Sequence, residues 1–492
     1  MFKKKTNKFV KITLFSILSF VLIFTSIPTA NADFIFMREG NVSKRANIPQ
    51  QYTVEKVVND LGEEYGFMNL PEDIFIDKND YIYICDTGNN RILILNPDAT
   101  VNRVITEIYD IPPESEDPRY KDQPTTFNQP SGIYVDPDGD IYIADTMNER
   151  ILHLDSTGKC VEMFWDPESQ LLYSIVSEFK PTKLYVNNTG YIYIIKRHDL
   201  MSIDADNAFR GLTASGVVDF SITQLFARLF YTKEQRDKMF KPAPPAFTNF
   251  MIHDDGLIYA TTLDQKHGEI KRINWVGENT FPDKKKYGLL AFTIDTVRDP
   301  YFVDIAVDQS GIVYALEKYN GYIYRYDPEG NLLGVLGGIG EVKGRYKEPS
   351  SLAVDSYGTV YVLDKTANNL QVLQPTGFTL KVTAAVEMYQ QGLYEESFDV
   401  WKEVLDVAGN YYVAHKGIGK AYYKKGLWLE AMDSYEKAGD VTGYSDAFAE
   451  YRHDIFRNNF VLVILAAIAI VLFIVWILTR LNWFSEDAVD FY

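Results

Sequence analysis

The stretch PSGIYVDPDGDIYIADTMNERILHL, residues 130–154, decides the fold that we expect for this chain. Two short alternating runs are separated by a turn of Asp, Pro and Gly, which predicts a β-hairpin. Residues 71–95 repeat the whole pattern. Both copies then carry an Asp-x-x-Asn-x-Arg-Ile element, formed by Asp86, Asn89, Arg91 and Ile92 in one copy and by Asp145, Asn148, Arg150 and Ile151 in the other.

The hairpin recurs in six copies at a spacing of about fifty residues. The copies begin at Pro71, Pro130, Pro181, Phe247, Phe302 and Pro349. One unit of this length makes a four-stranded sheet, which cannot bury its two faces alone. Six sheets arranged radially bury each face against the next sheet. The sequence therefore predicts a mainly β protein, with a six-bladed β-propeller over residues 50–376.

Closure of the ring needs one more strand than the last copy supplies. After the sixth hairpin only one further strand, near Leu370 to Leu373, fits before the sequence becomes helical. The segment QYTVEKVV, from Gln51 to Val58, precedes the first copy and has no partner there. We expect it to form the outer strand of the last blade.

These features resemble the NHL-repeat propellers, whose blades carry a proline-led inner strand, a Val-Asp turn and the Asp-x-x-Asn-x-Arg-Ile element. The resemblance covers about residues 50–376 and is most specific in copies one, two and six. Copies three and four depart from the element, with Lys196 and Thr262 in place of the aspartate, and copy five has Glu317 and Asn320 but Tyr322 in place of the arginine. We interpret the element as structural: Asp and Asn bond the turn between the third and fourth strands, and Arg bonds beneath it.

The third residues of the six copies are expected to meet at the mouth of the central channel. They are Asp73, Gly132, Lys183, Asn249, Asp304 and Ser351. Two carboxylates and one lysine on alternate blades neutralise one another more readily than they hold a divalent ion. We predict a small polar ligand site formed by Asp73, Lys183, Asn249 and Asp304, with plain solvation of the channel as the alternative. No catalytic residue, metal site or cofactor is predicted.

Two insertions interrupt the regular blades. Residues 109–128 form an acidic, proline-rich loop, and residues 217–240 have a helical pattern that ends before several prolines. A long loop that carries its own helix is often a contact surface, although it can equally well cap the rim of the propeller.

After Thr379 the period of the apolar residues changes from two to about three and a half. The segment MYQQGLYEESFDVWKEV, residues 388–404, is followed by the similar YYKKGLWLEAMDSYEKA, residues 422–438, so that Gly392 matches Gly426. A period of about 34 with small residues at the helix crossings resembles tetratricopeptide repeats. We expect a small helical domain over residues 380–457 that leans on the propeller, on the following helix or on a partner.

Both ends of the chain carry membrane signals. Residues 1–32 combine lysines, an apolar run and Ala-Asn-Ala, as a secretory signal does; an uncleaved anchor is the alternative. Residues 460–478 lack any charge, Gly or Pro and predict a single transmembrane helix. The bulk of the chain is then extracytoplasmic and residues 479–492 are cytoplasmic. From Ser445 to Leu478 there is no Gly or Pro, so we expect one unbroken helix.

Composition limits the function classes. The formal net charge of −18 repels nucleic acid, and the two cysteines, Cys85 and Cys160, are expected in the core rather than in a disulfide. The assembly is similar to bacterial proteins that occur with sugar-type ABC importers. That resemblance implies a membrane-anchored binding or scaffolding protein, an accessory of a membrane transport complex. The alternative is an extracytoplasmic propeller enzyme of lactonase or lyase type.

Overall fold

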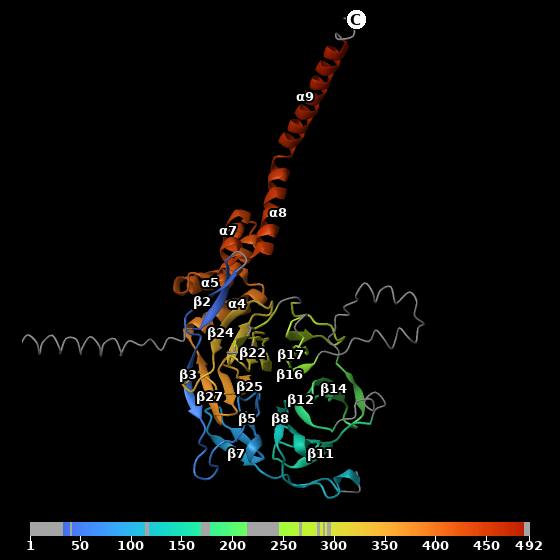
Figure 1. The fold of residues 1–492 in the computed structure, drawn as a ribbon, viewed down its shortest axis with the longest axis vertical. Coiled ribbons are helices and arrows are strands. Elements are labelled where there is room, and N and C mark those ends of the chain that lie inside the picture. The colour runs from blue at the N-terminus through green and yellow to red at the C-terminus, as the bar shows by residue number, and fades with distance from the viewer. Residues whose placement is uncertain are drawn as a thin grey trace, which may run out of the picture.

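The computed structural model describes residues 33–39, 42–113, 118–168, 178–213, 246–264, 268–282, 286–288, 291–292 and 297–486. The predicted signal peptide, the predicted inserted helix at 217–240 and residues 487–492 lie outside these ranges. The described residues form a six-bladed β-propeller followed by a helical region, and the last helix projects far from the ring (Figure 1).

In the first three blades, four antiparallel strands pair in chain order from the channel outward. The first blade comprises β4 (Asp73–Ile76), β5 (Ile82–Asp86), β6 (Arg91–Leu95) and β7 (Val101–Ile105). The second comprises β8 (Pro130–Val135), β9 (Ile141–Asp145), β10 (Arg150–Leu154) and β11 (Cys160–Phe164). The third comprises β12 (Pro181–Val186), β13 (Ile192–Lys196), β14 (Asp199–Ile203) and β15 (Phe209–Leu212). Short 3₁₀ turns lie at Thr87–Asn89, Pro118–Tyr120 and Thr146–Asn148.

The remaining blades vary this plan. The fourth has three strands among the described residues, β16 (Phe247–Ile252), β17 (Ile258–Thr262) and β18 (Ile270–Ile273), and the short pair β19 (Ala291–Phe292) and β20 (Val297–Arg298) follows. The fifth comprises β21 (Phe302–Val307), β22 (Val313–Glu317), β23 (Tyr322–Tyr326) and β24 (Leu332–Gly337). The sixth begins with β25 (Pro349–Val354), β26 (Val360–Asp364) and β27 (Asn369–Pro375).

The inner strands close a ring around the channel. Strands β4, β8, β12, β16, β21 and β25 contact one another in that order, and β25 contacts β4. Apolar side chains fill the spaces between blades. Ile84 of the first blade and Leu363 of the sixth, for example, are fully buried in one shared cluster. The two cysteines are buried and unpaired, as the sequence predicts.

The seam of the ring is the predicted one. Strand β3 (Tyr52–Val58) pairs antiparallel with β27, with Val58 opposite Leu370 and Tyr52 opposite Pro375. Tyr52 and Val58 are both buried. The first segment of the propeller therefore supplies the outer strand of its last blade, which leaves the sixth sheet with four strands.

A hairpin that the sequence analysis missed precedes this strand. Strands β1 (Phe34–Glu39) and β2 (Val42–Asn47) pair with each other, and Phe34 pairs with Val335 of β24. The hairpin thus widens the fifth blade to a six-stranded sheet. Its signal was weak because residues 33–47 match no copy of the repeat.

The helical region begins with two helix pairs. They are α4 (Gly377–Gln390) with α5 (Tyr394–Val407) and α6 (Tyr412–Lys424) with α7 (Trp428–Ala438). Gly392 and Gly426 occupy the matching turns at φ of 81° and 74°, a conformation that favours glycine. The first helices pack on the propeller, since Val382, Trp401 and other helical residues share a core cluster with strands of the fifth and sixth blades.

The last two helices correct the prediction of one rod from Ser445 to Leu478. Helix α8 (Val441–Asn458) begins four residues earlier, with Asp440 as the cap that accepts a bond from the Gly443 amide at 3.0 Å. Asn459 then leaves the helical conformation, at φ −112° and ψ 16°, before α9 (Phe460–Glu486). Its amide and its side-chain Nδ2 both donate to the Ile455 carbonyl, at 3.0 Å and 2.9 Å, and so cap the last turn of α8.

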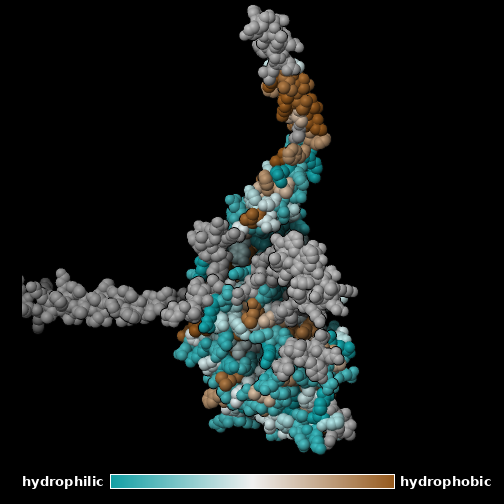
Figure 2. Space-filling view, turned by 45° about the vertical axis from the view of Figure 1, so that its right-hand side comes forward, coloured by the Kyte–Doolittle hydropathy of each residue, from teal (hydrophilic) through white to brown (hydrophobic). Residues whose placement is uncertain are grey.

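Helix α9 carries an apolar surface over most of its length. Within the described part of the chain, one helix is long and apolar enough to cross a membrane: residues Phe460–Arg480, with a mean hydropathy of 3.4. Figure 2 shows this band as a continuous hydrophobic surface beyond the largely hydrophilic propeller. Its 21 residues are about 32 Å long at 1.5 Å per residue, close to the thickness of a hydrocarbon layer.

Candidate functional site

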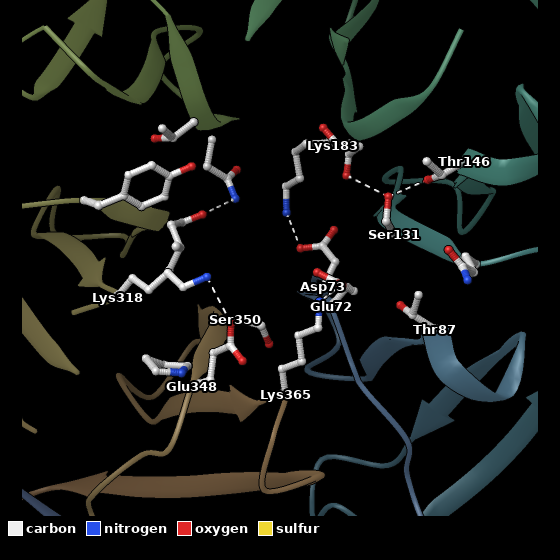
Figure 3. Close-up of a pocket in the computed structure, with 17 residues that line it drawn as sticks. Glu72, Asp73, Thr87, Ser131, Thr146, Lys183, Lys318, Glu348, Ser350 and Lys365 are labelled. Carbon is white, nitrogen blue, oxygen red and sulfur yellow. Dashed lines mark hydrogen bonds and ion pairs between the residues drawn. The ribbon is translucent and has the colours of Figure 1, made fainter. Parts of the chain in front are cut away.

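Two of the predicted channel-mouth residues, Asp73 and Lys183, face each other where the inner strands begin (Figure 3). Lys183 Nζ, on the third blade, lies 2.5 Å from Asp73 Oδ1, on the first. The Lys183 side chain is 12 % exposed and that of Asp73 is 3 % exposed. The pair therefore spans the second blade, whose third residue is Gly132. A Cβ at Gly132 would lie 2.7 Å from the Thr182 carbonyl oxygen, so glycine permits the close contact between these blades.

Ser351 connects this ion pair to the second carboxylate. Its hydroxyl contacts Asp73 Oδ1 at 3.1 Å and also bonds Asp304 Oδ2. Asp304 is 1 % exposed and lies beneath the residues that line the mouth. The four polar side chains thus form one chain of contacts, from Lys183 through Asp73 and Ser351 to Asp304.

Buried charge shifts the acid–base properties of this chain. Burial raises the pKa of Asp304 to about 6, although Lys183 works against the shift. Burial alone would lower the pKa of Lys183, but the carboxylates of Asp73 and Asp304 outweigh it and raise that pKa. The lysine is therefore held in its charged form, and the local charges largely compensate each other.

The same side chains also join neighbouring blades. Asp73 accepts from the Ile133 amide at 2.8 Å, and Asp304 accepts from the Leu352 amide at 2.7 Å. Asn249 Nδ2 donates to the Val303 carbonyl at 3.0 Å, and the Ile74 amide donates to Ser351 at 3.3 Å. Each of these bonds runs from one inner strand to the next. The structure thus brings Asp73, Lys183 and Asp304 into one chain of contacts and places Asn249 on the adjoining inner strand, and ligand binding by these four residues stays a prediction.

A cavity of about 370 Å³ lies above these residues. Asp73, Lys183 and Asn249 contribute to its wall. Its rim carries two more ion pairs that the sequence analysis missed: Lys365 with Glu72, and Lys318 with Glu348 at 3.0 Å. Hydroxyl groups complete the wall, from Thr87, Ser131, Thr146, Thr182, Thr248 and Ser350.

The missed residues have a positional signal. Thr87, Thr146, Lys318 and Lys365 each directly follow the acidic residue that ends the second strand of a blade. Glu72, Ser131, Thr182, Thr248 and Ser350 are the second residues of their copies. Comparison of these two positions among the six copies, in addition to the third residue of each copy, would have predicted the residues that line the rim.

The Asp-x-x-Asn-x-Arg element forms a closed set of bonds in the first blade. Asp86 accepts from Asn89 at 2.9 Å and from Arg91 Nε at 2.6 Å, while its other oxygen accepts from the Asn69 amide at 2.7 Å. Arg91 also donates to the Tyr65 carbonyl at 2.7 Å. These bonds attach the incoming loop to the blade.

The second blade repeats this arrangement with a fully buried ion pair. Asp145 accepts from Asn148 and from Arg150 Nε, both at 2.9 Å, and from the Asn128 amide at 2.7 Å. The interpretation of the element as structural fits this geometry. One detail of the prediction is wrong: the turn joins the second and third strands of each blade, β5 to β6 and β9 to β10, and not the third and fourth.

Among the residues that the structure describes, no group of three or more His, Cys, Asp and Glu side chains is arranged to hold a metal ion.

One comparison with known proteins matches the repeat in the sequence. Residues 127–154 match the NHL repeat, and no curated protein matches the chain. Virginiamycin B lyase from Staphylococcus aureus is similar at 13 % identity and a TM-score of 0.38, over 66 % of this chain and 99 % of that one. A putative gluconolactonase is similar at 10 % identity and a TM-score of 0.39, over 67 % and 94 %. The WD40 β-propeller domain of Doa1 is similar at 9 % and 0.38, over 66 % and 98 %. The family match thus identifies an NHL repeat in the chain, and this repeat contains the first three strands of the second blade of the six-bladed propeller.

Proposed function

We propose that this chain is a membrane-anchored binding or scaffolding protein whose propeller lies outside the cytoplasm. The observation that carries the proposal is the buried joint between the fifth blade and the helical region that leads to α9. A propeller joined firmly to a membrane anchor holds any bound partner at a fixed place near the membrane.

The joint is built from both hydrogen bonds and charges. Tyr411 donates to the Leu333 carbonyl at 2.7 Å, and Tyr412 donates to the Leu332 carbonyl at 2.8 Å. Lys420 Nζ lies 2.5 Å from Glu329 in the turn between β23 and β24. Tyr411 and Trp401 are almost fully buried in the cluster that they share with the blade. Separation of the two parts would leave these groups without partners.

The channel mouth supports a binding or structural role over a catalytic one. Catalytic carboxylates must reach substrate with free oxygens. Asp304 bonds the Leu352 amide and Ser351 and is buried, and Asp73 bonds the Ile133 amide, Ser351 and Lys183. Their oxygens hold the ring together. A small polar ligand could still dock on the hydroxyl-rich wall above them.

The proposed partner is a membrane protein complex, and the class named by the sequence resemblance is an ABC importer. Helix α9 and the exposed apolar residues of α8, such as Phe456 at 57 % exposure, offer surfaces that suit the transmembrane helices of such a complex. We place the propeller on the outer side because the leading segment has the features of an export signal.

The experiment is purification of the tagged full-length chain from membranes in mild detergent, with mass spectrometry and metal analysis. We expect a membrane protein to co-purify in a fixed ratio. Exchange of α9 for an unrelated apolar helix shows whether α9 contributes contacts with the partner. Lys437→Ala, on the exposed side of α7, is the control variant and should leave co-purification unchanged. A chain that purifies alone with one Ca²⁺ or Zn²⁺, which Asp73→Asn removes, would favour the lactonase or lyase alternative.

A further inference from the structure

A second cavity, of about 630 Å³, lies at the opposite ends of the inner strands. The second, third and fourth blades form it, mainly where their first strands turn into their second strands, and Asn274 and Trp275 join it from the end of β18. Its wall contains five large aromatic side chains: Tyr134, Tyr142, Tyr185, Tyr193 and Trp275. It therefore differs in both position and chemistry from the hydroxyl-rich cavity of the channel mouth.

The tyrosines form a packed aromatic floor. The rings of Tyr134 and Tyr185 have centroids 4.1 Å apart, and those of Tyr134 and Tyr142 are 6.2 Å apart. Burial raises the pKa of each of these three phenols, so the rings stay neutral at physiological pH. A neutral aromatic ring presents a negative face of its π-system, which attracts cations.

Trp275 lies at the rim with 91 % of its surface exposed. An indole so exposed contributes almost nothing to the core, because the free energy of burying apolar surface is not gained. It is free to cover a molecule that enters the cavity, and the indole has the strongest cation–π attraction of the aromatic side chains.

The charged residues of this wall all have one sign. Asp136, Asp138 and Asp254 line the cavity, and no Lys or Arg does so among the described residues. Asp136 uses Oδ1 to accept from the amides of Asp138 and Asp140, both at 2.9 Å. Asp138 and Asp254 are exposed, and within the described ranges no hydrogen bond or ion pair involves their carboxylates.

An ammonium group already lies beside this rim. Lys78 Nζ, from the first blade, donates to the carbonyl of Pro137 at 2.5 Å, and Pro137 borders the cavity. The positive charge of Lys78 offsets part of the charge of the three aspartates, which leaves the mouth of the cavity with a net negative charge.

We propose that this aromatic and acidic cavity binds an organic ammonium ion, either a free quaternary ammonium compound or a lysine side chain of a partner. The tyrosine floor and Trp275 would surround the cation, and Asp136, Asp138 and Asp254 would supply its counter-charge. This site is separate from the channel mouth and from the helical joint, so its failure would leave the proposed scaffolding function standing.

The test measures binding to the purified full-length chain by calorimetry and tryptophan fluorescence at constant ionic strength. The probes are choline, its neutral carbon isostere 3,3-dimethylbutan-1-ol, N-acetyl-lysine amide and glucose. We expect an ammonium probe to bind about tenfold more tightly than the isostere, which has the same shape without the charge. A higher affinity for choline assigns the site to a free quaternary ammonium compound, and a higher affinity for N-acetyl-lysine amide assigns it to a partner's lysine.

Variants locate the binding. Trp275→Ala and Asp254→Asn should each weaken the binding of the preferred ammonium probe several-fold. Val276→Ala, at an exposed neighbour outside the cavity wall, should leave it unchanged. The proposal would be overturned by any of three results. Choline, N-acetyl-lysine amide and the isostere bind with equal affinity, or glucose alone binds, or both cavity variants leave the binding of the ammonium probe intact.

Discussion

Lys183 and Asp73 form an ion pair at 2.5 Å although they belong to the third and first blades of the ring. The pair is nearly buried, and Asp73 also bonds the second and sixth blades through Ile133 and Ser351. Four of the six blades therefore meet at one carboxylate. The channel mouth therefore helps to close the propeller, in addition to any role in ligand binding.

Substitution of Lys183 should reveal that role. Lys183→Met leaves the buried Asp73 carboxylate without its counter-charge, so we expect the free energy of unfolding to fall by about 3–5 kcal/mol. Lys318→Met is the control, because its ion pair with Glu348 is exposed and should contribute less than about 1 kcal/mol. Denaturant titration measures both variants. Equal losses of stability would show that the Asp73 pair has no special structural role.

The raised pKa of Asp304 predicts a specific dependence on pH. Its value is about 6 in the folded chain, against about 3.9 for an unfolded aspartate. The folded state therefore binds a proton more tightly, and the resulting stabilisation is complete below about pH 4 and is lost as the pH rises through about 6. We therefore expect the Tm of the wild type to decrease relative to that of Asp304→Asn as the pH is raised from about 4 to above 6.

Asp98 offers the matched comparison for this titration. The hydroxyl and amide of Thr100 lower the pKa of Asp98. The Tm of the wild type should therefore increase relative to that of Asp98→Asn as the pH rises through the acidic range. A difference in Tm between wild type and Asp304→Asn that is constant from pH 4 to 7 would mean that Asp304 titrates normally.

The seam between β3 and β27 predicts the effect of truncation. Removal of residues 33–58 deletes the outer strand of the sixth blade and exposes the unpaired edge of β27, so we expect aggregation or a much lower Tm. Removal of residues 33–47 deletes only the β1–β2 hairpin and should have a smaller effect. Melting curves compare the Tm of both truncated chains with that of the full chain. An unchanged Tm after the longer truncation would contradict closure by β3.

The repeat made the propeller predictable from the sequence. The alternation of apolar and polar residues, together with Asp- and Gly-rich turns, predicted six hairpins. The segment from Gln51 to Val58 had no partner in the first copy and pairs with the free edge of β27 in the last blade. The third residues of the copies also indicated the channel mouth, because a period of two places them on one face of each inner strand.

Other features depend on contacts that no periodic pattern encodes. The chain from Asp73 through Ser351 to Asp304 arises because six blades converge, and the burial of Asp304 follows from that convergence. The helix break at Asn459 occurs without Gly or Pro, at a residue whose side chain bonds the Ile455 carbonyl. The aromatic cavity gathers residues from three copies of the repeat, each of which reads alone as an ordinary strand or turn residue.

Membrane topology has its own test. If the leading segment exports the chain, protease added to protoplasts should digest the propeller and leave a small fragment that contains Phe460–Arg480. Lysed protoplasts provide the control, in which the residues beyond the helix are cleaved as well. Protection of the propeller in intact protoplasts would place it in the cytoplasm.

The central claim is that the propeller is held beside a membrane complex, and site-specific photocrosslinking in living cells tests it most directly. A photoreactive residue at Phe456, on the exposed face of α8 next to the break at Asn459, should form adducts with integral membrane proteins. The same residue at Lys437, on the exposed surface of α7, reports nonspecific capture. A reproducible adduct with one membrane complex at Phe456 and not at Lys437 is the predicted result. Adducts with lipid or with the chain itself, and with no other protein, would contradict the account.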